Sequence, residues 1–184
     1  SSNVVLSVRS TFGKRSGSST VNQLNDDSLK DCVARSAELA KIAPEDPEFM
    51  PSLGPQTYPD VKAYFEKTAN VGPEFLANGS AECIKQASAK KLVAAGFVRT
   101  NAGFSAVGNS KGLFGYHRAT TIGFSETVRS ADGGSSGWVS RAGNKTEDIN
   151  FRQLSKIAVD KAIDSIEPMN LKPGKYVTIL EHSC

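Results

Sequence analysis

The chain has 184 residues, of which 22 are basic and 19 acidic, so its net charge is +3. That excess is too small to indicate nucleic acid binding by itself. Hydrophobic residues make up 39% and charged residues 22%, as is typical of a globular protein, and no apolar run approaches the ~20 residues of a membrane span.

The first third of the chain predicts a β-hairpin followed by a helix. Val4–Thr11 alternates like a strand, "GKRSG" at Gly13–Gly17 predicts a five-residue turn, and "SSTVNQ" predicts the return strand. A helix is expected at about Asp27–Ala43, with Asp27 as its cap. Five prolines in Pro44–Pro59 predict an extended surface loop.

The middle of the chain predicts a second helix and then a meander. The helix is expected at about Pro73–Ala95, with Gly96 as its stop. From Phe97 the apolar period changes to two, and the turns "GNSKG" and "ADGGSSG" divide the following sequence into three antiparallel strands. Asn109 and Gly112 tolerate left-handed backbone angles, so "NSKG" is expected to be a tight turn between paired strands rather than a ligand loop.

The last part predicts a third helix and a final strand. The helix is expected at about Asp148–Ile166, with Asp148 as a candidate cap, and the strand at Tyr176–Leu180. Helices and antiparallel strands in this order predict an α+β fold, in which an antiparallel sheet, a hairpin plus a long meander, packs with about three helices. We expect one α+β domain over residues 1–184.

Two short patterns resemble catalytic or phosphate-binding motifs. "GGSSG" matches G-x-S-x-G around Ser135, but a nucleophile elbow needs a helix after the serine, whereas Trp138 continues a predicted strand. The Gly13–Gly17 segment lacks the Walker spacing. Hairpin turns explain both patterns better.

The histidines and cysteines do not predict a metal site in this chain. His182 and Cys184 alternate after the final strand, but a zinc site needs at least three protein ligands. His117 is a possible third ligand, although its place opposite the aromatic stripe favours a solvated strand residue over a catalytic one. Cys32 and Cys83 fall in helical patterns and are expected to be buried thiols of a reducing, cytoplasmic protein. We expect no catalytic, cofactor-binding or metal-binding residue here.

Three stretches, in this order, resemble the TldD/PmbA family, also known as modulators of DNA gyrase. They are "VRSTFGKRSGSSTVNQLNDDSLKDCVARSAELAKIAPEDPEF", "GFSAVGNSKGLFGYHRATTIGFSETVRSADGGSSGW" and "LSKIAVDKAIDSIEPMNLKPGKYVTILEHSC". The resemblance covers nearly the whole chain. It implies a fragment of the N-terminal half of such a protein, and both ends of the chain, which lacks an initial Met, look cut.

The resemblance implies a metallopeptidase-like system whose catalytic metal lies elsewhere. TldD-type members carry a His-Glu-x-x-x-His motif after the strand that resembles Tyr176–Leu180, and zinc or iron could bind there or in a TldD-type partner. His182 is not followed by Glu, and "TILEHSC" is closer to the PmbA-type form, which lacks the motif. TldD-type and PmbA-type chains pair into a dimer that hydrolyses unfolded peptides.

The implied role of this segment is scaffold and dimerisation, as a homodimer or a heterodimer with a family member, without catalytic residues of its own. One alternative is a peptide-binding module that uses exposed strand edges. A second alternative, modulation of DNA gyrase, follows only from the family's older name. We expect no membrane partner, and nucleic acid is the least favoured one.

Overall fold

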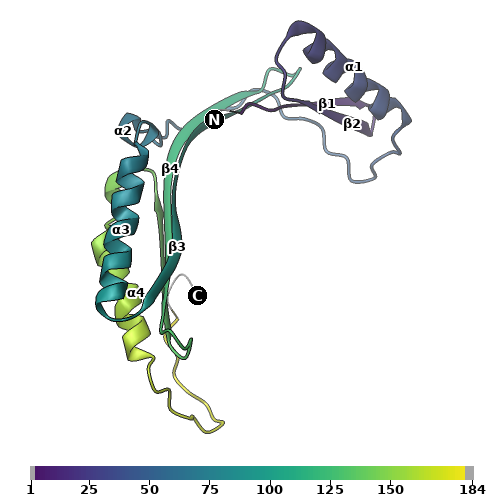
Figure 1. Cartoon of the computed structure of the whole chain (residues 1–184). Coiled ribbons are helices and arrows are strands. Elements are labelled where there is room, and N and C mark those ends of the chain that lie inside the picture. Colours follow the sequence, from purple (N-terminus) through teal and green to yellow (C-terminus); the bar gives the residue numbers. More distant parts are fainter. Residues whose placement is uncertain (1–2, 181–184) are drawn as a thin grey trace. The chain divides into compact units, whose positions relative to one another are not determined.

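The computed structural model describes residues 3–180, which form two compact units (Figure 1). The first unit ends at Leu53 and the second begins at Gly54. The prediction of a single domain over residues 1–184 stays a prediction, because compact units can fold together or separately.

The first unit is a hairpin with one helix packed against it. Strands β1 (Leu6–Phe12) and β2 (Arg15–Val21) pair antiparallel, and helix α1 (Asp26–Ile42) follows. The predicted five-residue turn is wrong, because Phe12 already pairs with Arg15. Gly13 has a φ of +62°, and a glycine with positive φ at the first central position allows a two-residue turn.

Helix α1 begins at a cap two residues earlier than the sequence predicted. Asn25 is the cap, and its side chain accepts a hydrogen bond of 2.9 Å from the Ser28 backbone N–H. The prediction of Asp27 as the cap is therefore wrong: Asp26 and Asp27 lie in the first turn, where carboxylates complement the helix dipole. No helix or strand lies between Ile42 and Glu66, as the prolines predicted.

The second unit has two layers. Its three strands, β3 (Val93–Gly108), β4 (Phe114–Arg129) and β5 (Ser136–Gly143), form an antiparallel sheet in the order β3-β4-β5. Helices α3 (Pro73–Ala89) and α4 (Phe151–Asp164) lie side by side on one face of this sheet (Figure 1). The short helices are α2 (Glu66–Ala69) and the 3-10 turn η1 (Thr146–Asp148). The predicted α+β class, with antiparallel sheets and helices, is confirmed.

The core lies between these helices and the sheet. Period-two alternation in β4 places Ile122, Phe124 and Val128 on the helix-covered face, where all three are buried. Small residues on α3 and α4 let the helices approach closely: Ala87, Ala158 and Ala162 have no exposed surface. The opposite face of the sheet remains exposed at Val93, Phe97 and Trp138.

The boundary between α3 and β3 differs from the predicted one. The helix ends at Ala89 rather than Ala95, and Lys91, with a φ of +58°, turns the chain into β3. Gly96 is therefore not a helix stop but a residue inside β3, where an added Cβ would lie 2.1 Å from the Ser125 carbonyl oxygen. The sequence pattern did not locate this boundary, because the alanines and the glycine before Phe97 are compatible both with the end of a helix and with the start of a strand.

The meander is confirmed over its whole length. Phe104 pairs with Arg118 and Phe114 with Gly108, so both phenylalanines lie on paired strands. Between the strands, the Asn109 side-chain oxygen accepts hydrogen bonds of 3.0 and 3.1 Å from the backbone N–H groups of Lys111 and Leu113. The "NSKG" segment is the predicted tight turn.

The last helix also has an asparagine cap. Asn150 accepts a 3.1 Å hydrogen bond from the Gln153 backbone N–H, and α4 starts at Phe151. The predicted start and cap at Asp148 are wrong, because Asp148 closes η1 by accepting from the Lys145 backbone N–H at 3.0 Å. Asp148 and Asn150 lie only two positions apart and either residue type can cap a helix, so the sequence allowed either start.

The predicted final strand at Tyr176–Leu180 is wrong, because the structure describes these five residues and none of the five lies in a strand. Val177 and Ile179 are 101% and 92% exposed. A strand needs a hydrogen-bonding partner, and nothing in residues 3–180 pairs with this run. In the same range, no helix has the length and apolar character needed to cross a membrane.

Candidate functional site

The candidate site is a two-stranded ribbon formed by the far ends of β3 and β4. Strand β5 pairs with β4 only from Ile122 onward, whereas β3 pairs with β4 along its whole length. The ribbon therefore consists of residues 101–108 of β3 and 114–121 of β4. Within residues 3–180, no strand pairs with the outer edge of β3, so half of its backbone groups face away from the sheet.

Exposed aromatic side chains lie on one face of the ribbon. The rings of Phe104 and Tyr116 are stacked, with centroids 5.9 Å apart, and the two residues are 57% and 56% exposed. Phe114 lies on the same face by alternation and is also exposed. The stripe continues the face that α3 and α4 bury farther along the sheet, but within residues 3–180 these two helices do not cover the three aromatic side chains.

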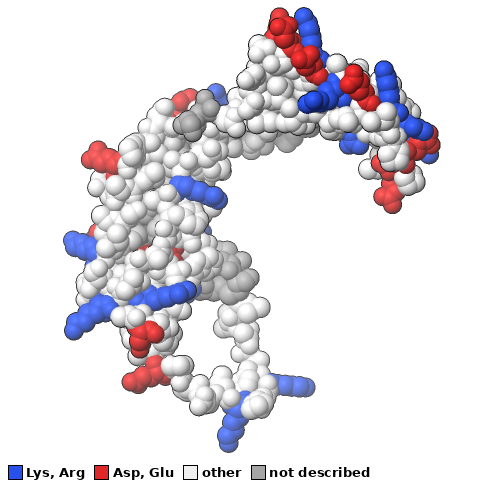
Figure 2. Space-filling view, turned by 45° about the vertical axis from the view of Figure 1, so that its right-hand side comes forward, with Lys and Arg blue, Asp and Glu red and all other residues white. Residues whose placement is uncertain are grey.

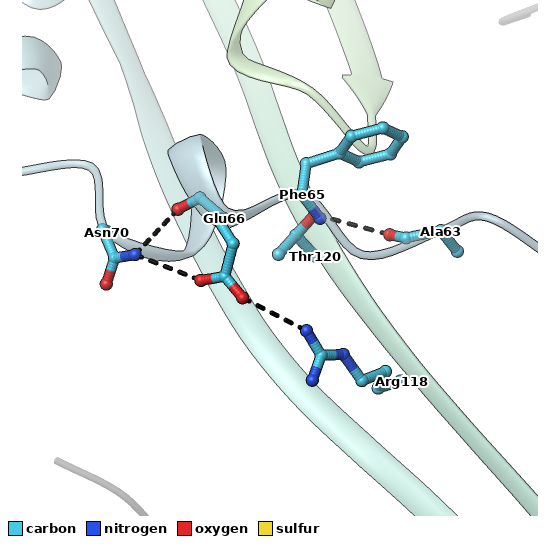
Figure 3. A network of polar contacts seen from close by, with 6 residues as sticks. All are labelled: Ala63, Phe65, Glu66, Asn70, Arg118 and Thr120. Atoms are coloured by element: carbon cyan, nitrogen blue, oxygen red, sulfur yellow. Dashed lines mark hydrogen bonds and ion pairs between the residues drawn. The ribbon is translucent and has the colours of Figure 1, made fainter.

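The ribbon is held by the segment that precedes α2 (Figure 3). The Thr120 backbone N–H donates to the Ala63 carbonyl at 3.0 Å, and the Phe65 N–H donates to the Thr120 hydroxyl at 3.2 Å. The same hydroxyl donates to the Asn144 carbonyl at 2.7 Å. These bonds cover the edge of β4 at the point where β5 ends, and Thr120 is fully buried.

Arg118 provides the positive charge of this region. Its guanidinium lies 3.5 Å from the centre of the Tyr64 ring. It also lies 3.3 Å from a Glu66 carboxylate oxygen (Figure 3). Asn70 donates to the same Glu66 carboxylate at 3.3 Å. Because the Arg118–Glu66 pair is solvent-exposed, it contributes little to stability but fixes the guanidinium over the aromatic ring.

Two shallow cavities border the ribbon. One, of about 370 Å³, is lined by Tyr58, Val107 and His117, among others. The other, of about 210 Å³, is lined by Tyr64, Phe104 and Arg118, among others. Their aromatic walls suit apolar or aromatic side chains of a bound segment.

The sequence of the second unit matches the sequence model of the PmbA/TldA metallopeptidase central domain over residues 66–166, which is more than half of the chain. The chain belongs to the PmbA/TldA family. The predicted resemblance to TldD/PmbA proteins is thereby confirmed. Among curated protein sequences, none matches this chain significantly.

Solved structures of similar fold agree with this assignment. A proposed modulator of a DNA gyrase from Thermotoga maritima has a TM-score of 0.80 at 14% identity, over 92% of this chain and 39% of its own. TldE from Thermococcus kodakarensis has a TM-score of 0.73 at 19% identity, over 86% of this chain and 37% of its own. A second proposed gyrase modulator, from Bacteroides thetaiotaomicron, has a TM-score of 0.78 at 17% identity, over 92% of this chain and 41% of its own. The chain thus spans about two fifths of each relative, and at these identities the likeness concerns the fold.

The structure separates the residues that the sequence singled out in this family member. Ser135 lies in the turn before β5, is 4% exposed, and is followed by a strand rather than the helix of a nucleophile elbow. His117 is exposed on β4, on the strand face expected from the sequence. His182 and Cys184 lie outside the described residues. The hairpin turn in the first unit contains only Gly13 and Lys14.

Metal-ligating side chains do not gather anywhere in residues 3–180: no three of His, Cys, Asp and Glu could hold one ion. Cys32 and Cys83 are buried free thiols, each in a different unit.

Sequence reasoning missed one buried polar cluster. Glu126 occupies a helix-facing position in β4 between the buried Phe124 and Val128, and it meets Cys83 of α3 and Ser155 of α4. The signal was present in the sequence, because a carboxyl residue interrupts an apolar row of period two. Only the packed structure shows that this side chain is buried rather than turned to solvent.

Proposed function

We propose that this chain is the scaffold and dimerisation part of a TldD/PmbA-like peptidase system that acts on unfolded peptides. Family membership supports the peptidase context. In this proposal the chain supplies no catalytic residue, and the hydrolytic metal, zinc or iron, belongs to another region of the longer protein or to a TldD-type partner. Water activation by such a metal supplies the chemistry of hydrolysis.

The observation that carries the scaffold proposal is apolar surface on two faces of the same sheet. The helix-free face exposes Val93, Phe97 and Trp138, and the ribbon exposes Phe104 and Tyr116. Several large exposed apolar side chains on one face of a sheet mark a surface that packs against other protein. Both exposed faces are explained if the sheet packs against a further domain on one face and against a partner chain on the other.

A peptidase assay tests the division of labour. Three samples receive the same unstructured peptide: this chain alone, a longer family protein that contains it, and that protein with a second family chain. We expect metal-dependent cleavage only in the samples that contain the longer protein. Metal-dependent cleavage by the highly purified chain alone would contradict the scaffold role and would bring His182 and Cys184 back as ligand candidates.

Self-association tests the dimerisation part separately. In sedimentation experiments on the longer protein, Phe104→Ser in the ribbon should weaken the dimer about tenfold or more, because an aromatic anchor is lost from the interface. The matched control is Met50→Ser, which removes another exposed apolar side chain from the proline-rich loop. Equal dimer constants for the two variants would remove the ribbon from the interface.

The unpaired edge of β3 favours a second candidate function, a non-catalytic module that binds extended peptides. A peptide added as a strand would bond to every second backbone amide of β3, whose edge is open over residues Val93–Gly108. Hydrogen exchange measured by NMR should then show alternate β3 amides slowed by the peptide. The amides of β4 opposite β5 serve as controls, since both neighbours already pair with that strand.

Uniform slowing along β3, or none, would contradict strand addition.

Modulation of DNA gyrase is suggested only by the descriptions of two structural relatives. The net charge of +3 adds no support. The face of the second unit seen in Figure 2 carries separate blue and red side chains between broad white areas.

A further inference from the structure

A second cavity lies away from the ribbon, between α3 and the strands β3 and β4. Its volume is about 360 Å³. Ile84, Ala94 and Phe124 contribute apolar wall, and Glu126 and Cys83 contribute the polar groups that the argument below uses. The cavity thus combines apolar walls with one carboxyl group, the composition of a site for a ligand with one polar end.

The Glu126 carboxyl group is only half satisfied. The residue is 2% exposed, and the Ser155 hydroxyl donates to its Oε1 atom at 3.1 Å. The Oε2 atom is buried and has no hydrogen-bond partner. An unpartnered buried carboxyl oxygen is costly, so a ligand that donates a hydrogen bond to it would remove that cost.

Space beside the carboxyl group exists because its cross-strand neighbour on β3 is a glycine. Gly96 pairs directly with Glu126. An added Cβ at Gly96 would lie 2.1 Å from the Ser125 carbonyl oxygen, so the tight approach of the strands excludes a side chain there. No residue-96 side chain fills the volume next to Glu126.

The charge of the site lacks a counterpart. No basic residue lines the cavity, and within residues 3–180 no Lys, Arg or His forms an ion pair with Glu126. Burial, helped by the Glu126 charge, raises the pKa of the neighbouring Cys83 thiol to about 11, so this thiol stays neutral at pH 7. Burial likewise raises the pKa of Glu126, because desolvation penalises the carboxylate, and a bound cation would oppose that effect.

We propose that this cavity binds a primary ammonium group on a short apolar stem, with the ammonium donating to Glu126 and the stem lying against Ile84, Ala94 and Phe124. A linear alkylamine and the side chain of a lysine share this chemistry. The proposal does not depend on the scaffold function, because it concerns a different surface.

Binding of n-pentylammonium to the full chain tests the proposal, with NMR shifts of the Ala94, Gly96 and Ser125 amides as the readout. We expect saturable shifts with a Kd on the order of millimolar, as for a ligand of this size. The uncharged 1-pentanol should bind at least about tenfold more weakly, and pentanoate should give no saturable shift, because a charge-assisted hydrogen bond is lost or replaced by repulsion.

Two variants and a matched control locate the site. Glu126→Gln keeps the side-chain size but removes the charge, and should weaken pentylammonium binding about tenfold or more. Ala94→Leu fills the cavity without changing Glu126 and should abolish binding, which keeps the test decisive if Glu126→Gln does not fold. Glu82→Gln makes the same charge change on α3 outside the lining and should leave Kd unchanged.

Equal affinity for pentylammonium and pentanol, or unchanged binding in both Glu126→Gln and Ala94→Leu, would overturn the proposal. Two pentapeptides separate the sources of the ligand, one with a central lysine and one with norleucine in its place. Shifts with the lysine peptide alone assign the site to a peptide side chain. Shifts with pentylammonium but neither peptide assign it to a free amine.

Discussion

At Glu126 a carboxyl group lies in the middle of an apolar row of β4, and its burial makes a contribution to stability that depends on pH. Burial raises the folded-state pKa above the ordinary value of 4.5, while the hydrogen bond from Ser155 and the neighbouring Cys83 thiol oppose the rise. The folded state therefore holds this proton at pH values where the unfolded chain has released it. Stability is unaffected below about pH 4.5 and falls as the pH rises toward the folded-state pKa.

The first prediction is that Glu126→Gln flattens this part of the pH profile. The difference in unfolding free energy between the variant and the original chain should shift in favour of the variant as the pH rises above 4.5. The shift should be roughly 1–3 kcal/mol, the cost of an unpaired buried group. Urea unfolding at pH 4, 6 and 8 measures it, with Glu82→Gln as the control; parallel profiles for all three proteins would show that Glu126 titrates normally.

Among the elements, the helices α1 and α4 depend on asparagine caps that satisfy their first backbone N–H groups. The caps are Asn25 and Asn150, and neither helix begins at the aspartate that the sequence pattern favoured. In both places several Asn and Asp residues precede the helix, and each could cap it. The choice was made by packing, which fixes the rotation of each helix on its sheet.

The second prediction concerns the cap of α4. Asn150→Ala should lower the free energy of unfolding by about 1 kcal/mol, because the Gln153 N–H loses its partner. The same substitution at Asn78, an exposed residue inside α3, should be neutral or stabilising by a few tenths of a kcal/mol, owing to the higher helix propensity of alanine. Urea unfolding compares the two; equal losses would mean that the cap contributes nothing.

For the molecule as a whole, glycines set the distance between helix and sheet in both compact units. An added Cβ at Gly17 would lie 2.3 Å from the Ala40 backbone nitrogen in the first unit. At Gly137 it would lie 2.1 Å from the Ala158 carbonyl oxygen in the second. Both neighbours are helix backbone, so the helix itself would have to move.

The third prediction uses these glycines to test the single-domain organisation. Gly17→Ala and Gly137→Ala should each destabilise by about 1–3 kcal/mol, as overpacking does. If the chain is one domain, both should lower the same unfolding transition. Gly72→Ala, which meets no atom within 4 Å, is the control. Separate transitions, one sensitive to each substitution, would contradict a single domain.

The fourth prediction is that the chain alone holds no stoichiometric zinc or iron. Within residues 3–180 no three potential ligands converge, and the whole sequence offers only two histidines and three widely spaced cysteines. Metal analysis after dialysis should find far less than one ion per chain. About one tightly held ion per chain would require a site that includes the C-terminal residues.

The sequence by itself determined the order and type of most elements and the family of the chain. Period-two alternation identified the meander, because a strand exposes alternate residues to different faces whatever it packs against. The Asn109–Gly112 turn was also predictable, since a left-handed angle favours glycine, as at Gly112, and an asparagine side chain bonds to nearby backbone N–H groups, as at Asn109. The three stretches that resemble the family were likewise recognisable from neighbouring residues alone, without knowledge of tertiary contacts.

The tertiary structure alone decided which residues are buried, capped or left without a partner. The apolar run Tyr176–Leu180 favours a strand, yet a strand forms only against a neighbour, and residues 3–180 provide none. In the sequence, Glu126 is a charged residue at a position where the alternation predicts an apolar core residue. The structure shows that Cys83, Ser155 and Gly96 surround its buried side chain. The exposed ribbon exists because β5 stops at Gly143, opposite Ile122, a consequence of pairing that no single segment encodes.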